Sequence, residues 1–306
     1  MLTTLASGVS FFDLQFQATP RVIATAVLHG AAGVALVDPG PSSTLPTLRR
    51  ELGDAGISTA DVTALLLTHI HLDHAGAAGT MVRENPRLRV YVHEKGAPHI
   101  TNPDKLVASA TRLYGDAMER LWGEIAPVPS SAIVALGGGE RVQEGGRTLE
   151  VAYTPGHASH HVSYFSADTG IAFVGDTAGI KRGPIGYVLP PTPPPDIDLE
   201  LWRESLVRLG AWSPQTVFLT HFGPHTPGGP HLHEMTEHLE FVLSLAQASL
   251  AREESDEARE EWFAEAVRHE LRRWIGEGEA RTYEVAGRFD LSWRGLARYL
   301  RNRAAR

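Results

Sequence analysis

Three histidines and one aspartate lie within a short segment of the chain, in the order His69, His71, Asp73 and His74. Neutral imidazole nitrogens and carboxylate oxygens are ligands that zinc, iron and manganese accept. A helix is a poor host for this spacing, because side chains at positions i, i+2 and i+4 of a helix point in divergent directions. A chance cluster in a surface loop is the alternative without function. The spacing favours a metal site, and its density of ligands suggests two ions.

Three later residues of metal-binding type, His157, Asp176 and His221, each follow closely on an apolar segment. These segments and the one before His69 are rich in the residues typical of buried strands. The strands that they predict span residues 62–67, 148–153, 171–175 and 217–220. If the ends of these four strands converge on one edge, the side chains assemble one site.

The remaining pattern alternates between strands and helices. Further strands are predicted over residues 21–29, 33–37 and 89–92, and helices over residues 43–55, 76–84, 97–124, 196–209, 237–251, 255–274 and 291–302. The apolar residues between 97 and 124 are interpreted as core or lid packing. Pro190 to Pro195 is a proline-dense stretch expected to cross the surface near the mouth of the site.

Composition narrows the class of protein. The 306 residues, 42% of them hydrophobic, suffice for a full-sized core. The absence of cysteine excludes disulfides and thiolate ligands. No apolar run approaches the length of a membrane span, and no signal segment is recognisable, so we expect a cytoplasmic protein that does not bind membranes. A net charge of −8 argues against nucleic-acid binding.

The arginines near the C-terminus are the exception to the acidic character of the chain. Arg294, Arg298 and Arg301 recur at helical spacing. We interpret them as the solvated end of a helix, where cations complement the helix dipole. Contact with nucleic acid or with an acidic substrate is the alternative.

The order and context of the candidate ligands resemble the metallo-β-lactamase superfamily. The residues that carry the resemblance are His69, His71, Asp73, His74, His157, Asp176 and His221. The likeness runs from about residue 20 to 225. It implies an α/β fold, the four-layer αββα metallo-β-lactamase sandwich, with a helical C-terminal extension. The corresponding domains are residues 1–230, the catalytic sandwich, and residues 231–306, helices packed on it.

The resemblance also implies a role for each residue. It assigns three ligands to each of two divalent ions: His69, His71 and His157 to the first, and Asp73, His74 and His221 to the second. Asp176 would bridge them, since a carboxylate has two oxygens. We expect zinc, with iron or manganese as alternatives. A hydroxide between the ions would be the nucleophile, and Asp73 would act as the catalytic residue that orients it or takes up its proton.

The resemblance says less about the identity of the substrate than about the residues of the site. The B1 β-lactamases of this fold use a cysteine at the second metal, which this chain lacks. Lactonases of the superfamily carry a tyrosine where this chain has Gly179. The glutathione-binding groups of glyoxalase II have only loose counterparts in Lys181, Arg182 and Tyr187. These three residues serve equally well as loop residues without a function.

We therefore predict a binuclear metal-dependent hydrolase that attacks an ester, thioester or lactone-like bond of a small molecule. One alternative is a mononuclear-iron sulfur dioxygenase. Another is a phosphodiesterase or nuclease of the same superfamily, which the net acidity disfavours. The C-terminal helices are expected either to cover the site or to form the interface of a homodimer.

Overall fold

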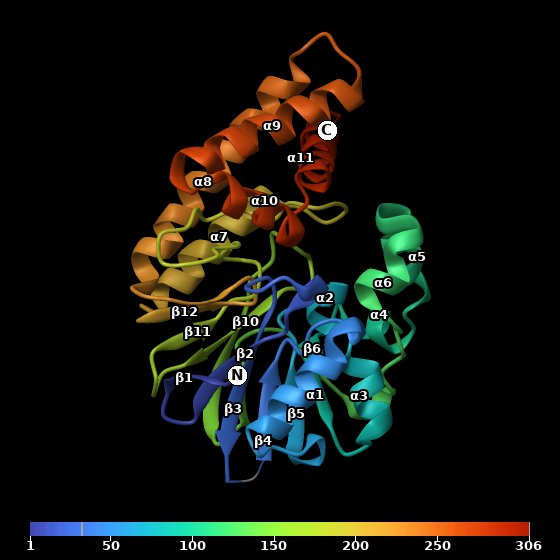
Figure 1. Ribbon diagram of the computed structural model, residues 1–306, viewed down its shortest axis with the longest axis vertical. Coiled ribbons are helices and arrows are strands. Elements are labelled where there is room, and N and C mark those ends of the chain that lie inside the picture. The colour runs from blue at the N-terminus through green and yellow to red at the C-terminus, as the bar shows by residue number, and fades with distance from the viewer. Residues whose placement is uncertain (32, 306) are drawn as a thin grey trace.

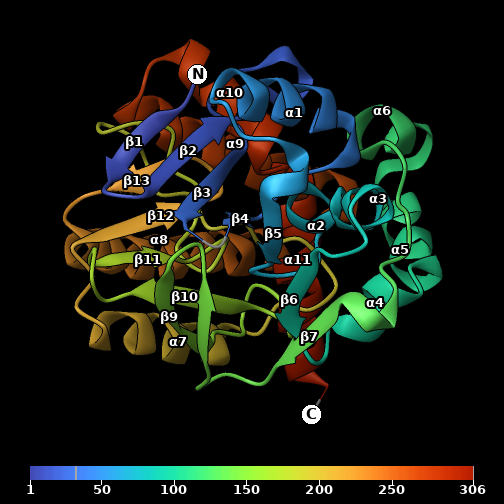
Figure 2. The ribbon, with the colours of Figure 1, turned by 90° about the horizontal axis from the view of Figure 1, so that it is seen from below.

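Two β-sheets lie face to face, and helices cover the outer face of each (Figure 1, Figure 2). The computed structural model describes residues 1–31 and 33–305. Helices α1 and α3 lie outside the first sheet, and α7 and α8 outside the second (Figure 2). Further helices from the C-terminal part stand over one end of the sandwich (Figure 1). The predicted αββα architecture with a helical C-terminal part is confirmed.

The first sheet follows the order of the chain. In the described residues its strands are β1 (Thr3–Ala6), β2 (Val9–Asp13), β3 (Ala24–Gly30), β4 (Gly33–Val37), β5 (Val62–Leu66), β6 (Arg89–His93) and β7 (Ile133–Leu136). Pairing is antiparallel from β1 to β4 and parallel from β4 to β7. The parallel strands are almost uniformly apolar, because helices and the second sheet bury both of their faces.

The second sheet has the strand order β13-β12-β11-β10-β9-β8. Its strands are β8 (Arg141–Glu144), β9 (Arg147–Tyr153), β10 (Val162–Ser166), β11 (Ile171–Phe173), β12 (Thr216–Leu219) and β13 (Gly223–His225). Only β11 and β12 pair in parallel in the described part of this sheet. The helix α7 makes the crossover between them.

The α-helices account for most of the other described residues. They are α1 (Leu45–Asp54), α2 (Leu72–Ala75), α3 (Ala78–Glu84), α4 (Ala97–Thr101), α5 (Asp104–Tyr114), α6 (Met118–Trp122), α7 (Leu199–Ala211), α8 (Gly228–Leu250), α9 (Asp256–Trp274), α10 (Glu277–Ala286) and α11 (Phe289–Ala304). Side-chain caps begin two of the longer ones. Asp198 accepts a hydrogen bond from the backbone N–H of Leu201, and Ser255 accepts one from Ala258.

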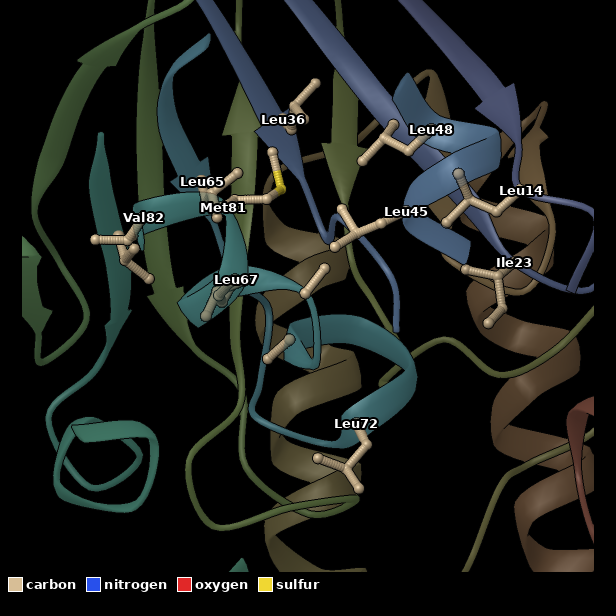
Figure 3. Close-up of a cluster of buried hydrophobic side chains, with 14 of the residues drawn as sticks. Leu14, Ile23, Leu36, Leu45, Leu48, Leu65, Leu67, Leu72, Met81 and Val82 are labelled. Carbon is tan, nitrogen blue, oxygen red and sulfur yellow. The ribbon is translucent and has the colours of Figure 1, made fainter. Parts of the chain in front are cut away.

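Each interface between layers has its own apolar core. Between the first sheet and its helices, Leu36 and Leu65 on the strands join Leu48 on α1 and Met81 on α3 in one buried cluster (Figure 3). A second cluster fills the space between the sheets, and a third lies between the second sheet and the helices α7 to α11. The spacing of buried leucines on α1, at positions 45, 48 and 52, is the helical period that turns one face of α1 inward.

The strands that precede the candidate ligands all end at the same edge of the sandwich. Strands β4 and β5 run parallel, as do β11 and β12. Strand β9 runs in the same direction as β11, because each is antiparallel to β10. The loops that follow β4, β5, β9, β11 and β12 therefore meet, as the sequence predicted for four of them.

The segment 97–124 differs from the single long helical section that was predicted. It forms three short helices, α4, α5 and α6, separated by breaks. Pro103 disfavours helical geometry at the preceding residue, and Asn102 is extended there. At Gly115 the backbone has a positive φ of 51°, which ends α5. These breaks let the segment bend along the outside of the first sheet.

The C-terminal helices form a bundle in which α9 and α11 pack on each other and on α8. Helix α8 begins at Gly228, earlier than predicted, because Pro230 is tolerated in a first turn. The predicted boundary at residue 230 thus lies within α8, and the division into two domains stays a prediction. Arg294 and Arg301 pair with Glu260 and Asp256 across the bundle. Among the described helices, none is long and apolar enough to cross a bilayer.

Replacement of Leu271 by alanine tests the packing of this bundle. Leu271 on α9 is fully buried in the third core cluster. We expect Leu271→Ala to lower the free energy of unfolding by about 2–5 kcal/mol, through lost burial and the cavity left behind. Val207 on α7 is 75% exposed, so Val207→Ala should change stability by less than about 0.5 kcal/mol. Denaturant unfolding of both variants measures the difference, and equal effects would contradict this account of the core.

Candidate metal centre

The seven predicted ligands lie together at the carboxyl edge of the strands. The structure groups them into three overlapping sets whose nitrogen and oxygen atoms lie within 4.8 Å of one another. The sets are His69, His71 and His157; His69, His74 and Asp176; and Asp73, His74 and His221. The first and third sets are the two ligand groups that the sequence predicted. The segment from Thr68 to Ala75 supplies four of these residues from one loop and the short helix α2.

In the first group three imidazole nitrogens converge. The Nδ1 atom of His71 lies 2.9 Å from Nε2 of His69 and 3.0 Å from Nε2 of His157. These histidines come from two sheets, since His157 follows β9 and the other two follow β5. Three nitrogens that face one point are the arrangement expected for ligands of one ion.

In the second group the carboxylates stand beside two imidazoles. Asp73 Oδ2 lies 3.3 Å from Nε2 of His221 and 3.9 Å from Nε2 of His74. Asp176 connects the two groups: its Oδ2 lies 3.4 Å from Nε2 of His157, and its Oδ1 lies 3.3 Å from Nε2 of His74. One oxygen of Asp176 thus faces the first group and the other faces the second.

The outward nitrogen of several histidines is held by a hydrogen bond. Nδ1 of His74 donates to Asp38, Nδ1 of His157 to the carbonyl of Pro191, and Nδ1 of His221 to the carbonyl of Val22, at 2.7–2.8 Å. A proton on Nδ1 leaves the lone pair on Nε2, which faces the cluster. Such outer hydrogen bonds orient metal-binding histidines.

The carboxylate of Asp38 is the main support of this edge. It is fully buried and accepts hydrogen bonds from the backbone N–H and hydroxyl of Thr68, the hydroxyl of Thr220 and Nδ1 of His74. It therefore ties together the ends of β4, β5 and β12. Asp38 was not among the residues predicted for the site, although a buried strand precedes it just as a strand precedes the candidate ligands.

The surroundings of the two groups shift the pKa values of their histidines in opposite directions. Burial and the neighbouring imidazole of His157 lower the pKa of His71 to about 3. Burial also lowers the pKa of His69 well below its ordinary value. Burial would lower the pKa of His74 too, but the carboxylates around it, Asp176 above all, raise it well above the ordinary value. The first group consists of neutral imidazoles, and the second lies in a negative field that favours a cation.

Two buried polar atoms of the cluster lack a hydrogen-bond partner among the described residues. They are Nε2 of His74 and Oδ1 of Asp176. Buried polar atoms are rarely left unpaired, because desolvation without a partner is costly. A cation that accepts lone pairs from both would satisfy them. The donor set of nitrogen and carboxylate oxygen therefore fits divalent metal ions such as zinc, iron and manganese.

A cavity of about 610 Å³ opens onto the cluster. Five of the predicted ligands line it, namely His71, Asp73, His157, Asp176 and His221. Its other walls come from α5 and α6, the proline-rich segment near residue 193 and the junction of α10 with α11. The segment 97–124 was predicted to serve as core or lid packing, but no local pattern in the sequence could connect it with the C-terminal helices.

Helix α11 supports the site through the proline-rich segment. The hydroxyl of Thr192 donates to the carbonyl of Ser292, 3.1 Å away. A side chain at Gly295 would lie only 2.0 Å from the carbonyl oxygen of Thr192, so glycine permits this close approach. The carbonyl of Pro191, beside Thr192, holds His157. The C-terminal helices thus help to build the site, whichever other role they have.

The three residues considered for binding glutathione serve other purposes. Lys181 pairs with Glu234 at 2.8 Å, and most of its side chain is buried. Arg182 is buried and donates to the carbonyl of Pro20, 3.1 Å away. Tyr187 is buried and stacks on His238, with ring centroids 3.9 Å apart. None of the three belongs to the lining of the cavity.

Comparisons with known proteins agree with this geometry. The chain is 30% identical over 235 residues to the metallo-beta-lactamase fold-containing protein ST1585 of Sulfurisphaera tokodaii, covering 76% of this chain and 82% of that protein. It is 28% identical over 169 residues to a hydroxyacylglutathione hydrolase of Synechococcus, covering 55% of this chain and 52% of that enzyme. This second match therefore spans about half of the enzyme's length.

The fold has a solved counterpart over nearly the whole chain. The metallo-beta-lactamase family protein TTHA1429 from Thermus thermophilus superposes with a TM-score of 0.71 at 24% identity, covering 99% of this chain and 96% of that one. The model of the metallo-beta-lactamase superfamily matches residues 18–221, which include every predicted ligand. The chain therefore belongs to the metallo-β-lactamase superfamily and is a metallo-hydrolase of that family.

Proposed function

We propose that this protein is a binuclear hydrolase that cleaves a thioester or ester of a small carboxylic acid. The observation that carries the proposal is the placement of Asp176, whose two oxygens face two separate groups of ligands. A site for a single ion would need only the three nitrogens of the first group. The second group supports a second ion, because Nε2 of His74 and the Oδ1 atom of Asp176 that faces it are buried without a hydrogen-bond partner in the described part of the chain.

The first ion would be held by His69, His71 and His157, and the second by Asp73, His74 and His221, with Asp176 between them. Bound there, divalent ions supply Lewis-acid polarisation of a carbonyl and lower the pKa of a coordinated water. Zinc suits the nitrogen-rich first group, and iron or manganese also suits a mixed set.

The chain itself supplies the proton handling and the exclusion of water. Asp73 is the more exposed of the two carboxylates of the cluster, Asp73 and Asp176, and it lines the cavity. It can accept a proton from the attacking water and pass it to the leaving group. Asp176 is almost fully buried, which suits a ligand better than a proton carrier. The apolar walls of the cavity limit the access of bulk water to the carbonyl.

Thioesters are favoured over other acyl compounds by the relatives. The enzyme from Synechococcus is named for the hydrolysis of hydroxyacylglutathione, which is a thioester. Its similarity to this chain spans only about half of the enzyme, so we carry over the cleavage of a thioester and not the specificity for glutathione. Lys181, Arg182 and Tyr187 make contacts outside the lining of the cavity, which also argues against a specificity for glutathione that depends on them.

Replacement of Asp176 tests the proposal. Asp176→Asn should reduce the bound metal below two ions per chain and lower kcat/KM on thioesters by more than about a hundredfold, because loss of a mere supporting residue already costs 10–100-fold. The control is His29→Gln, which alters a histidine that hydrogen-bonds Ser10 outside the cluster. Metal analysis and thioester turnover provide the readouts.

Two results would contradict the binuclear hydrolase. If Asp176→Asn kept both metal and activity, Asp176 would not be a bridge. If the wild-type protein bound one iron and consumed oxygen with a persulfide substrate, it would be a sulfur dioxygenase instead.

Replacement of Asp38 by asparagine tests the support of His74. The amide keeps an acceptor for the N–H of Thr68, but its NH₂ group cannot accept the proton on Nδ1 of His74. His74 would then shift its proton to Nε2, the atom that faces the cluster. We expect metal affinity to fall by about 10–100-fold, measured by competition with a chelator. Asp54→Asn, at an exposed position on α1, should leave the affinity unchanged; an equal loss there would refute the tautomer argument.

A further inference from the structure

The cavity above the cluster is larger than the reacting bond requires. Its volume of about 610 Å³ is that of a site for a whole small molecule. The cluster forms only part of the lining, and other parts come from α5, α6 and the junction of α10 with α11. A substrate that places its carbonyl at the cluster must therefore fill the remaining space with another group.

The walls away from the cluster are mainly apolar. Trp122 stacks on Phe16, with ring centroids 5.7 Å apart, and meets Tyr114 edge to face at 5.0 Å. These three rings and the side chains of Leu113 and Leu291 line the cavity. Aromatic side chains that pack on one another form a rigid wall, so the space is preformed and does not collapse on itself.

Basic side chains lie at the border of this apolar space. Lys95 and Lys105 both line the cavity and are exposed to solvent. Within residues 1–31 and 33–305, neither has a carboxylate within salt-bridge distance, whereas Arg288, which also lines the cavity, pairs with Asp290. Lys95 donates to the hydroxyl of Tyr153 and lies over its ring. No carboxylate of the described residues therefore neutralises either lysine, and both can meet a negatively charged group of a ligand.

We propose that the substrate is a thioester of an apolar carboxylic acid whose acyl chain lies in this cavity and whose thiol half carries negative charge near Lys95 and Lys105. The inference rests on the proposed function and adds its substrate class. In the reaction, water adds its oxygen to the carbonyl carbon, the carbon–sulfur bond breaks, and the released thiolate takes up a proton. The products are a fatty or aromatic acid and a free thiol.

The length of the acyl chain is the first test. Acetyl, butanoyl, hexanoyl and octanoyl thioesters of coenzyme A are hydrolysed with the metal-loaded protein, and kcat/KM is compared. We expect a rise of about fourfold for each methylene that leaves water, up to the length that fills the cavity. A flat or falling series with measurable acetyl turnover would overturn the inference but leave the proposed hydrolase intact. Absence of turnover at every length would instead reject the hydrolase.

A cavity-filling variant links the length preference to the structure. Ala110 on α5 is buried and lines the cavity, whereas Ala108 on the same helix is exposed and does not. Ala110→Phe should cut octanoyl turnover by more than about tenfold, with acetyl turnover retained, since each excluded methylene costs about fourfold. Ala108→Phe should leave the whole series unchanged. If Ala110→Phe does not fold, Ala110→Leu is used in its place, and we expect a smaller loss of turnover for the thioesters with the longest acyl chains.

Binding of the product gives a readout that does not depend on turnover. Calorimetry should detect binding of octanoate, weaker binding of hexanoate and none of acetate, and Ala110→Phe should weaken the binding of octanoate. Equal binding of octanoate by the wild-type and Ala110→Phe proteins would place the acid outside the cavity and overturn the inference.

The charge of the thiol half is the second test. Octanoyl thioesters of coenzyme A, glutathione and the neutral N-acetylcysteamine are compared. The charged thioesters should have lower KM values, and Lys105→Glu should raise their KM by about threefold or more while sparing the neutral thioester. Arg112→Glu, at an exposed position on α5 outside the cavity lining, is the matched control. A preference for the coenzyme A thioester would identify phosphates as the charged groups that meet the lysines, and a preference for the glutathione thioester would identify carboxylates. Equal KM values for all three thioesters would overturn the charge assignment.

Discussion

The buried carboxylate of Asp38 is the interaction on which the site depends. It lies at the end of β4, receives donors from the ends of β5 and β12, and holds His74 in the orientation that faces the cluster. A buried charge is stable only where hydrogen bonds satisfy it. The two sheets must therefore meet in one arrangement at this edge, and that arrangement brings the two groups of ligands together.

A chain of contacts extends this constraint to the C-terminal helices. Helix α11 approaches the proline-rich segment closely at Gly295, and the carbonyl of Pro191 in that segment holds His157. The same helix and its junction with α10 form one wall of the cavity, opposite α5 and α6. The bundle that stands over the sandwich in Figure 1 thus supports a ligand and shapes the space above it.

The parts of the fold that were predicted well share a physical cause. Strand β5 and helices α1, α9 and α11 were placed nearly where they lie, because their apolar residues recur with the period of one structure. The segment 97–124 was not, because Pro103 and Gly115 interrupt a pattern that is otherwise helical. The start of α8 was missed since glycine and proline at its first turn are weak signals for a helix.

The sequence by itself determined the chemistry of the cluster: the types of the seven candidate ligands, the strands that precede them and the exclusion of cysteine. Candidate metal ligands can be proposed this way because their identity is a property of single residues next to single strands. Only the tertiary structure decided that Asp38 supports the site and that Tyr114 and Leu291 share one cavity. These relations join residues far apart in the chain, and contact between them depends on how the layers pack, which no local pattern encodes.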